Sequence, residues 1–434
     1  MSDALFTDFY ELTMMAGYHA AGRAEEPAVF DLFFRHNPQG VDHVVAAGLD
    51  PVLDVLERLA FDDDDLAYLD SLGRFDEGFL SWLADLTFTG DVWAIPEGRL
   101  VFGREPLVRI EAPLAQGQLV ETAVINRIAY GTLIASNARQ VSLAAAGKPV
   151  LEFGARRAHG PDGAVSATRA ALVGGCAATS NVEAARRYDL PVSGTQAHSW
   201  IMSWADELEA FRAYARTFPE DCILLIDTYD TLEVGLPHAI TVADELAEAG
   251  YRLGGVRLDS GDLGALSREV RARLDDAGHP DVSIIVSGDL DAPKVAALEA
   301  VGAPIDGYGV GTALVTARQD PAFSGVYKLA EIAGEPVMKL SSSPEKSTEP
   351  GRKQVWRTSS GDVIGLADEE VDGEPLLSCA MRGGRRLAPA TPIAELARRA
   401  SADAERVAAA GDWPITRTPG LEALRNDLSA RSRV

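Results

Sequence analysis

The chain has 434 residues, of which 47% are hydrophobic and 24% charged, and its formal net charge is −25 at pH 7. The length predicts two or three domains, or one large barrel with attached pieces, and the composition is typical of a folded enzyme. The negative charge and the lack of a basic stripe with interleaved aromatics argue against nucleic acid as a partner. A site for an anionic substrate must therefore use local arginines, metal ions or backbone NH groups.

The three cysteines, at positions 176, 222 and 379, are widely spaced and form no CxxC pair. Their pattern favours neither a disulfide framework nor a cysteine metal site, and it predicts a reducing compartment. No stretch of about 18 consecutive apolar residues occurs, and the first residues lack the basic and apolar segments of an export signal. We therefore expect a cytoplasmic protein without a membrane segment.

Residues 1–120 mix helical patches with the extended runs 28–35 and 107–110, without a regular alternation of strands and helices. This mixture predicts a separate N-terminal α+β domain. The acidic run 62–65 is interpreted as the solvated start of a helix.

Residues 121–325 form the second predicted domain. Between 150 and 312, short apolar runs alternate with amphipathic stretches, which indicates βα units around a parallel sheet. The expected strands are 150–153, 171–173, 190–192, 223–226, 253–258, 283–286 and 307–310. The expected helices are 182–188, 205–218, 239–249, 264–277 and 292–301. Active sites of α/β barrels form at the carboxyl ends of the strands, so the polar segments there are the candidate site.

The third predicted part, residues 326–434, begins with extended segments at 337–340 and 355–358. The polar stretch 341–353 between them is interpreted as a mobile loop that could act as a lid. The tail then returns to helical sequence rich in alanine and arginine.

Two acidic residues, Asp259 and Asp262, flank a glycine-bearing turn after the strand predicted at 253–258. Such a turn can present NH groups to a phosphate, while its carboxylates hold Mg²⁺ or a ribose hydroxyl. The alternative is a helix N-cap, in which Ser260 or Asp262 only starts the next helix.

Glycines follow the last two predicted strands. Gly309, Gly311 and Thr312 follow one of them, and Gly288 and Asp289 follow the other. Glycines at such positions allow the backbone to approach a phosphate closely, as in the phosphate sites late in many barrels. A plain strand-to-helix turn is the alternative.

One histidine, His198, also follows a predicted strand, in the segment GTQAHS. It could act as a base or nucleophile, and Asp227 at the next strand end is the nearest candidate to orient it. A structural histidine is the alternative.

Arg156 and Arg257 lie at two strand ends. Their planar guanidinium groups could bind a carboxylate or a phosphate, or instead form ion pairs with Glu152 or Asp259. No GxGxxG after a strand, Walker P-loop, HExxH or GxSxG motif is present. Dinucleotide, kinase-type, zincin and serine hydrolase chemistry therefore lack their usual support.

Six segments together resemble the nicotinate phosphoribosyltransferase family, a type II phosphoribosyltransferase family. They are 7–14 (TDFYELTM), 30–35 (FDLFFR), 152–157 (EFGARR), 194–199 (GTQAHS), 256–262 (VRLDSGD) and 309–312 (GVGT). The resemblance implies an α/β fold, namely an irregular TIM-like α/β barrel with an N-terminal α+β domain completed by C-terminal segments. It also implies a homodimer with active sites at the subunit interface.

The resemblance further implies that nicotinate and phosphoribosyl pyrophosphate react in NAD salvage, with ATP as co-substrate and Mg²⁺ as cofactor. Carried over by motif, Tyr10 of the neighbouring subunit would stack on the pyridine ring. Thr195 and Arg257 would contact nicotinate, with Arg156 close by.

The same resemblance assigns the phosphates. Thr312 and the glycines around it would hold the 5'-phosphate, and Asp259 and Asp289 would face the ribose and the Mg²⁺-pyrophosphate. His198 matches the histidine that is phosphorylated in the family.

Residues 178–181 (ATSN) offer neutral hydroxyls and an amide where nicotinamide-specific relatives place a carboxylate, which favours nicotinate. A nicotinamide or quinolinate phosphoribosyltransferase is the nearest alternative, and the latter lacks the ATP-linked histidine. A non-enzymatic phosphosugar-binding module is the second alternative.

Overall fold

The computed structural model describes residues 3–39, 41, 43–340 and 347–431. The chain forms two compact units, of which unit 1 comprises Met1–Ser136 and Ala322–Val434, and unit 2 comprises Asn137–Pro321. Helix α6 (Glu121–Ala144) begins at the boundary predicted from the sequence, and its residues are divided between the units. None of the helices in these described ranges is long and apolar enough to span a membrane.

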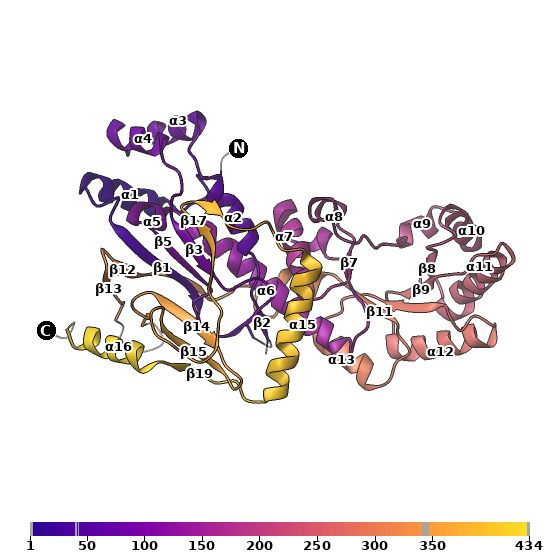
Figure 1. Ribbon diagram of the computed structural model, residues 1–434. Coiled ribbons are helices and arrows are strands. Elements are labelled where there is room, and N and C mark those ends of the chain that lie inside the picture. Colours follow the sequence, from indigo (N-terminus) through magenta and orange to yellow (C-terminus); the bar gives the residue numbers. More distant parts are fainter. Residues whose placement is uncertain (1–2, 40, 42, 341–346, 432–434) are drawn as a thin grey trace. The chain divides into compact units, whose positions relative to one another are not determined.

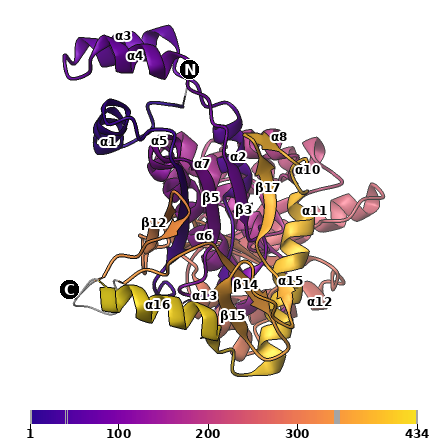
Figure 2. The ribbon, with the colours of Figure 1, turned by 60° about the vertical axis from the view of Figure 1, so that its left-hand side comes forward.

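Unit 1 is built on a seven-stranded sheet in which the interior strand β1 is almost entirely buried. β1 pairs antiparallel with β5 from the N-terminal part and with β12 from the C-terminal part, as Figures 1 and 2 show. The order is β13 (Glu335–Pro336), β12 (Gly325–Ile332), β1 (Pro27–Phe34), β5 (Val108–Pro113), β3 (Asp91–Ala94), β17 (Ser378–Arg382) and β18 (Arg385–Arg386). C-terminal segments thus complete the N-terminal α+β domain, as the resemblance implies.

Two smaller sheets complete the strands of unit 1. They are β16 (Glu374–Pro375), β14 (Lys353–Arg357), β15 (Asp362–Leu366) and β19 (Ile415–Arg417) in one sheet, and β2 (Val44–Val45) and β4 (Leu100–Val101) in the other. The helices are α1 (Phe9–Ala20), α2 (Leu49–Glu57), α3 (Asp63–Ser71), α4 (Glu77–Ala84), α5 (Leu114–Leu119), α15 (Ile393–Ala410) and α16 (Pro419–Arg431).

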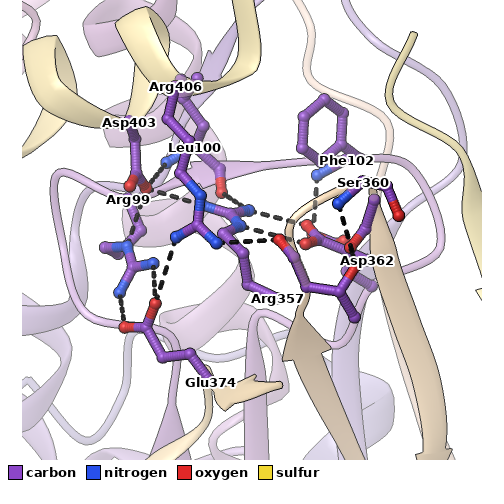
Figure 3. Close-up of polar contacts among 12 residues, drawn as sticks. Arg99, Leu100, Phe102, Arg357, Ser360, Asp362, Glu374, Asp403 and Arg406 are labelled. Atoms are coloured by element: carbon purple, nitrogen blue, oxygen red, sulfur yellow. Dashed lines mark hydrogen bonds and ion pairs between the residues drawn. The ribbon is translucent and has the colours of Figure 1, made fainter. Parts of the chain in front are cut away.

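A buried ionic network joins the smaller sheets to α15, as Figure 3 shows. The Arg357 guanidinium is fully buried and donates to Asp362 Oδ2 at 2.7 Å and to Asp403 Oδ2 at 2.7 Å. Arg99 donates to the same Asp403 carboxylate at 2.7 Å and to Glu374 at 2.6 Å. Removal of the Arg357 guanidinium would leave the fully buried Asp362 carboxylate without its ion-pair partner, and breaking a buried pair in this way typically costs about 3–5 kcal/mol.

Unit 2 contains a six-stranded sheet in which all the strand pairs are parallel. The order is β7 (Ala178–Thr179), β6 (Val150–Glu152), β11 (Gly307–Val310), β10 (Ser283–Val286), β9 (Gly255–Leu258) and β8 (Ile223–Leu225). All four residues of β11 are buried, as expected for a central strand covered on both faces.

The remaining segments of unit 2 are mostly helical and lie around the sheet (Figure 1). They are η1 (Ala155–Arg157), α7 (Gly160–Val173), α8 (Val182–Tyr188), α9 (His198–Met202), α10 (Glu207–Thr217), η2 (Thr231–Gly235), α11 (Leu236–Glu248), α12 (Leu263–Asp276), α13 (Ala292–Ala300) and α14 (Thr312–Thr316). With the close structural match described below, this sheet confirms the predicted irregular α/β barrel.

Three expected strands are corrected by the structure. The run 171–173 is the end of helix α7, because a short apolar run is compatible with a buried helix as well as a strand. The run 190–192 contributes only an isolated bridge between Thr179 and Val192, and 337–340 forms no strand. Six of the thirteen residues of the predicted lid 341–353, namely 341–346, lie outside the described residues.

Candidate active site

Polar side chains meet at the carboxyl ends of three neighbouring strands, β8, β9 and β10. Asp259 directly follows β9, Ser287 directly follows β10, and Asp227 lies two residues beyond β8. Because the strands are parallel, these ends lie at one edge of the sheet. Hydrogen bonds between the side chains connect the three strand ends.

Asp227 is the centre of these connections, although its side chain is only 2% exposed. Its Oδ2 accepts hydrogen bonds from the backbone N–H of Asp259 at 2.8 Å and from Ser260 Oγ at 2.7 Å. Its Oδ1 lies 3.3 Å from His198 Nε2. The expected contact between His198 and Asp227 is therefore present, and the same carboxylate also fixes the backbone after β9.

Asp259 and Asp262 have different surroundings. Asp259 Oδ1 accepts a hydrogen bond of 2.5 Å from Ser287 Oγ. Asp262 instead caps helix α12, because its Oδ1 accepts a hydrogen bond from the backbone N–H of Ala265 at 3.0 Å. The N-cap interpretation is thus correct for Asp262, whereas Asp259 remains directed to the strand ends.

Arg257 lies in β9 and is directed to the segment that precedes His198. Its Nη1 donates to Thr195 Oγ1 at 2.8 Å, and its Nη2 donates to the Gln196 carbonyl at 3.0 Å. Its Nε is buried and has no hydrogen-bond partner among the described residues. Burial lowers the pKa of this guanidinium, and the nearby charge of Arg156 lowers it further. Two arginines thus place positive charge at this edge of an acidic chain.

Glu152 is not the ion-pair partner that the sequence allowed for Arg156. It is fully buried, and its carboxylate accepts hydrogen bonds from the Gly154 backbone, from Thr168 Oγ1 at 2.9 Å and from Thr179 Oγ1 at 2.6 Å. Glu152 therefore has a structural role. The guanidinium of Arg156 is exposed and forms no ion pair within the described part of the chain.

The segment 178–181 is mostly committed to the fold. Thr179 is buried against Glu152, and Asn181 caps helix α8 through a hydrogen bond from the Ala184 backbone at 3.3 Å. Only Ser180 is exposed. The preference for nicotinate predicted from this segment therefore depends on Ser180 alone.

Gly288 packs against the end of β9 so closely that no side chain fits there. Its φ is +101°, and a Cβ would lie 1.9 Å from the Asp259 carbonyl oxygen. The next residue, Asp289, is 59% exposed at its side chain and has a φ of +46°. Its carboxylate binds Lys294 Nζ at 3.1 Å and Arg318 Nη1 at 3.2 Å, and the Lys294 hydrogen bond holds the pKa of Asp289 below its usual range.

Gly309 and Gly311 pack against Phe153, where a Cβ would lie 2.7 Å from the ring and 3.0 Å from the carbonyl oxygen, respectively. Close packing explains these glycines without a phosphate. Thr312 is the first residue of α14. Within the described chain no hydrogen bond joins Thr312 to Arg257, although β11 and β9 both neighbour β10 in the sheet.

Tyr10 belongs to unit 1, where it lies on α1 with 46% of its surface exposed. Partial burial and the Glu121 carboxylate raise the pKa of its hydroxyl.

The sequence suggested Ser260 only as a possible helix start, but its hydroxyl donates to Asp227 and Asp262 caps the helix. No role was predicted for the Ser287 hydroxyl, although its position directly after a strand, in the motif SGD, was an available signal. Across the described residues, no group of three His, Cys, Asp or Glu side chains could hold a metal ion.

Convergent polar groups at the ends of parallel strands define an enzyme with an α/β-barrel architecture. The nicotinate phosphoribosyltransferase (NAPRTase) N-terminal domain matches residues 5–129, and the nicotinate phosphoribosyltransferase (NAPRTase) family matches residues 149–368. The chain belongs to the nicotinate phosphoribosyltransferase family.

Individual relatives support this assignment. Nicotinate phosphoribosyltransferase pncB2 of Mycobacterium tuberculosis is 47% identical over 400 residues, which cover 91% of this chain and 85% of that protein. The Bacillus subtilis nicotinate phosphoribosyltransferase is 46% identical over 386 residues, or 86% of this chain and 78% of that protein. The crystal structure of human nicotinic acid phosphoribosyltransferase has a TM-score of 0.87 at 31% identity and covers 97% of this chain and 99% of that chain.

Proposed function

We propose that this protein transfers the 5-phosphoribosyl group of phosphoribosyl pyrophosphate to nicotinate, forming nicotinate mononucleotide and pyrophosphate for NAD salvage. Family membership supports the reaction. The observation that carries the assignment of the site is that two hydrogen-bonded groups lie at one sheet edge: Arg257 with Thr195, and Asp227 with His198 and the Asp259 backbone. This edge combines positive charge for an anionic ring with a carboxylate for a sugar.

The chemistry requires positioning and charge neutralisation more than a strong base. Departure of pyrophosphate leaves an oxocarbenium-like C1, and the pyridine nitrogen must be aligned with it while water is excluded. Arg257 and Arg156 would bind the nicotinate carboxylate, and Thr195 is held beside it by Arg257. Desolvation of Arg257 strengthens such an ion pair.

Asp259 is the residue that fits a ribose hydroxyl or a Mg²⁺ ion that arrives with pyrophosphate. One carboxylate oxygen is bound by Ser287, and the other has no hydrogen-bond partner in the described ranges. Bound Mg²⁺ would neutralise charge on the leaving pyrophosphate. The Asp289 carboxylate is paired with Lys294 and Arg318, so these two cations would become available to phosphate if Asp289 turned away.

We assign phosphate binding to the end of β11, which lies next to β10, because Gly309 lies near the end of this strand and Gly311 and Thr312 follow it. The backbone there carries no side chain at Gly309 and Gly311. The 5'-phosphate would lie at this end, beside the ribose at Asp259.

We also propose that ATP hydrolysis is coupled to transfer through phosphorylation of His198. A proton on Nε2 would face Asp227, which leaves Nδ1 as the nucleophile for the γ-phosphoryl group of ATP. ADP would leave, and water would later release phosphate from the imidazole. The phosphoryl group adds about two negative charges beside Asp227 and would move the attached Asp259 segment.

Two further expectations belong to the proposal. The active enzyme would be a homodimer in which Tyr10 of one subunit completes the site of the other. A reducing, cytoplasmic location would keep the free thiols of Cys176, Cys222 and Cys379 reduced.

The test is a product assay of the purified chain with phosphoribosyl pyrophosphate, Mg²⁺ and one of three bases: nicotinate, nicotinamide or quinolinate. We expect a mononucleotide from nicotinate, and faster turnover when ATP is added. A product from another base in preference to nicotinate would support the corresponding alternative transferase. Binding of the sugar pyrophosphate without product would support the phosphosugar-binding module.

A further inference from the structure

The hydroxyl of Ser287 is held firmly against Asp259 by the pairing of two strands. The Ser287 backbone N–H donates to the Leu258 carbonyl at 2.8 Å, which continues the parallel ladder between β10 and β9. This places Ser287 Oγ 2.5 Å from Asp259 Oδ1, and Ser287 is only 4% exposed. The donor is therefore buried and has a fixed position before any ligand binds.

The backbone of Asp259 is also fixed, which leaves its carboxylate as the part free to rotate. Its N–H donates to Asp227, and Gly288 packs against its carbonyl oxygen. The terminal torsion of an aspartate is broad, so the side chain alone does not define which oxygen faces the site. In the described chain, Ser287 supplies the single hydrogen bond to this carboxylate, and Oδ2 receives none.

We infer that Ser287 is a positioning residue that occupies Asp259 Oδ1 and so presents Oδ2 alone to the ribose or to Mg²⁺-pyrophosphate. The inference rests on the proposed function, because it concerns how the sugar pyrophosphate is bound. Ser287 does not touch the substrate in this scheme and acts through Asp259. A carboxylate held by a donor before binding loses less conformational freedom when the ligand arrives.

The test compares steady-state kinetics of the full chain and of Ser287→Ala, which removes one oxygen without a change in backbone or packing shape. We expect KM for phosphoribosyl pyrophosphate to rise about ten- to a hundredfold, the range for loss of a hydrogen bond to a charged group. KM for nicotinate should change less than about threefold. The control is Ser267→Ala, because Ser267 is also buried and hydrogen-bonded, to the Gly264 carbonyl at 3.1 Å.

A double-mutant cycle with Asp259→Asn tests whether Ser287 acts through Asp259. If it does, Ser287→Ala should have little further effect on KM for the sugar pyrophosphate in the Asp259→Asn background. Additive effects, equal losses for both substrates, or kinetics like those of the unmodified chain would each overturn the inference. Failure of the unmodified chain to make nicotinate mononucleotide would instead refute the proposed function.

Discussion

Individual residues at the edge of the parallel sheet have separate tasks, and His198 has the most specific one. Its ring contacts Asp227, which in turn holds the Asp259 backbone. We expect His198→Ala to abolish the stimulation by ATP and to leave a slow, uncoupled transfer. The measurement is the rate of mononucleotide formation with and without ATP, together with the ADP formed per product.

A matched control is His238→Ala. His238 also contacts a buried carboxylate, Glu207 Oε2, at 3.1 Å, but it lies on α11. The His238→Ala variant should therefore be stimulated by ATP as strongly as the unmodified chain. Equal ATP dependence of His198→Ala and the unmodified chain would reject the phosphohistidine.

Gly288 is the residue whose replacement should disturb the site most directly. In Gly288→Ala the added Cβ would displace the Asp259 carbonyl, and the positive φ adds about 1–2 kcal/mol of backbone cost. We expect an additional loss of about 1–3 kcal/mol from the steric clash, measured by urea unfolding.

Gly278→Ala separates these two contributions. Gly278 has a φ of +86°, but a Cβ added there would have no atom within 4 Å. It should therefore show the backbone cost without the clash. Equal stabilities of the two variants would contradict the tight contact between Gly288 and Asp259.

At the level of elements, helix α3 shows how local sequence specifies a start. Asp62 accepts a hydrogen bond from the Asp65 backbone at 2.9 Å, and Asp65 accepts one from the Asp62 backbone at 3.2 Å. We expect Asp62→Ala to destabilise α3 by about 0.5–2 kcal/mol, measured by hydrogen exchange of the helix amides.

Asp64→Ala is the matched control, because Asp64 is an exposed carboxylate in the same first turn and makes no cap. Both variants remove one negative charge from the helix N-terminus. Faster exchange in Asp64→Ala than in Asp62→Ala would show that charge, and not the capping box, starts this helix.

At the scale of the whole molecule, the buried network of unit 1 makes stability depend on pH. Burial, followed by the Asp362 charge, raises the pKa of Glu105 well above its unfolded value near 4.5. Between the unfolded pKa and the raised pKa of the folded state, folded Glu105 keeps a proton that unfolded Glu105 loses. The free energy of unfolding therefore falls as pH rises through this range. Glu105→Gln mimics the protonated acid and should flatten this fall in urea unfolding series between about pH 5 and 8.

Glu374→Gln supplies a control of opposite sign in the same network. Hydrogen bonds from Arg99 lower the pKa of Glu374, so its contribution is present above the unfolded pKa and is lost only as pH falls below it. In Glu374→Gln, the free energy of unfolding should therefore change with pH as steeply as in the unmodified chain above about pH 5. If the free energy of unfolding of Glu105→Gln falls with pH as steeply as that of the unmodified chain, Glu105 is ionised in the folded state.

The proposed dimer also gives a prediction for the whole molecule. Because Tyr10 is 46% exposed, Tyr10→Ala should not alter unfolding, whereas loss of ring stacking should raise KM for nicotinate about two- to tenfold. Tyr10→Phe keeps the ring and should remain close to the unmodified chain.

Mixed dimers of Tyr10→Ala and His198→Ala test whether sites are shared. If Tyr10 acts on the neighbouring subunit, one of the two sites in a mixed dimer contains both intact residues, and ATP-stimulated activity with low KM should return. If no such activity returns on mixing, Tyr10 does not complete the partner's site.

Much of the architecture followed from local patterns in the chain. Helix α8 and strands β10 and β11 agree with their predicted residues, because strongly apolar strands and amphipathic helices have clear periodicity. The prediction of a strand at 171–173 was wrong, because three apolar residues fit either a strand or the buried end of α7. The motifs were also sufficient to indicate the family, whereas the roles of the candidate site residues stay predictions.

The partners of those residues required the folded chain. Asp259 and Asp262 look equivalent in DSGD, but only Asp259 meets Ser287, because β9 and β10 pair in one particular register. Glu152 likewise turned inward to Thr168 and Thr179 and not to Arg156. Local sequence encodes which elements form, since periodicity and capping act over a few residues. Contacts such as Ser287 with Asp259 join residues that are distant along the chain, so their geometry exists only once the strands have packed together.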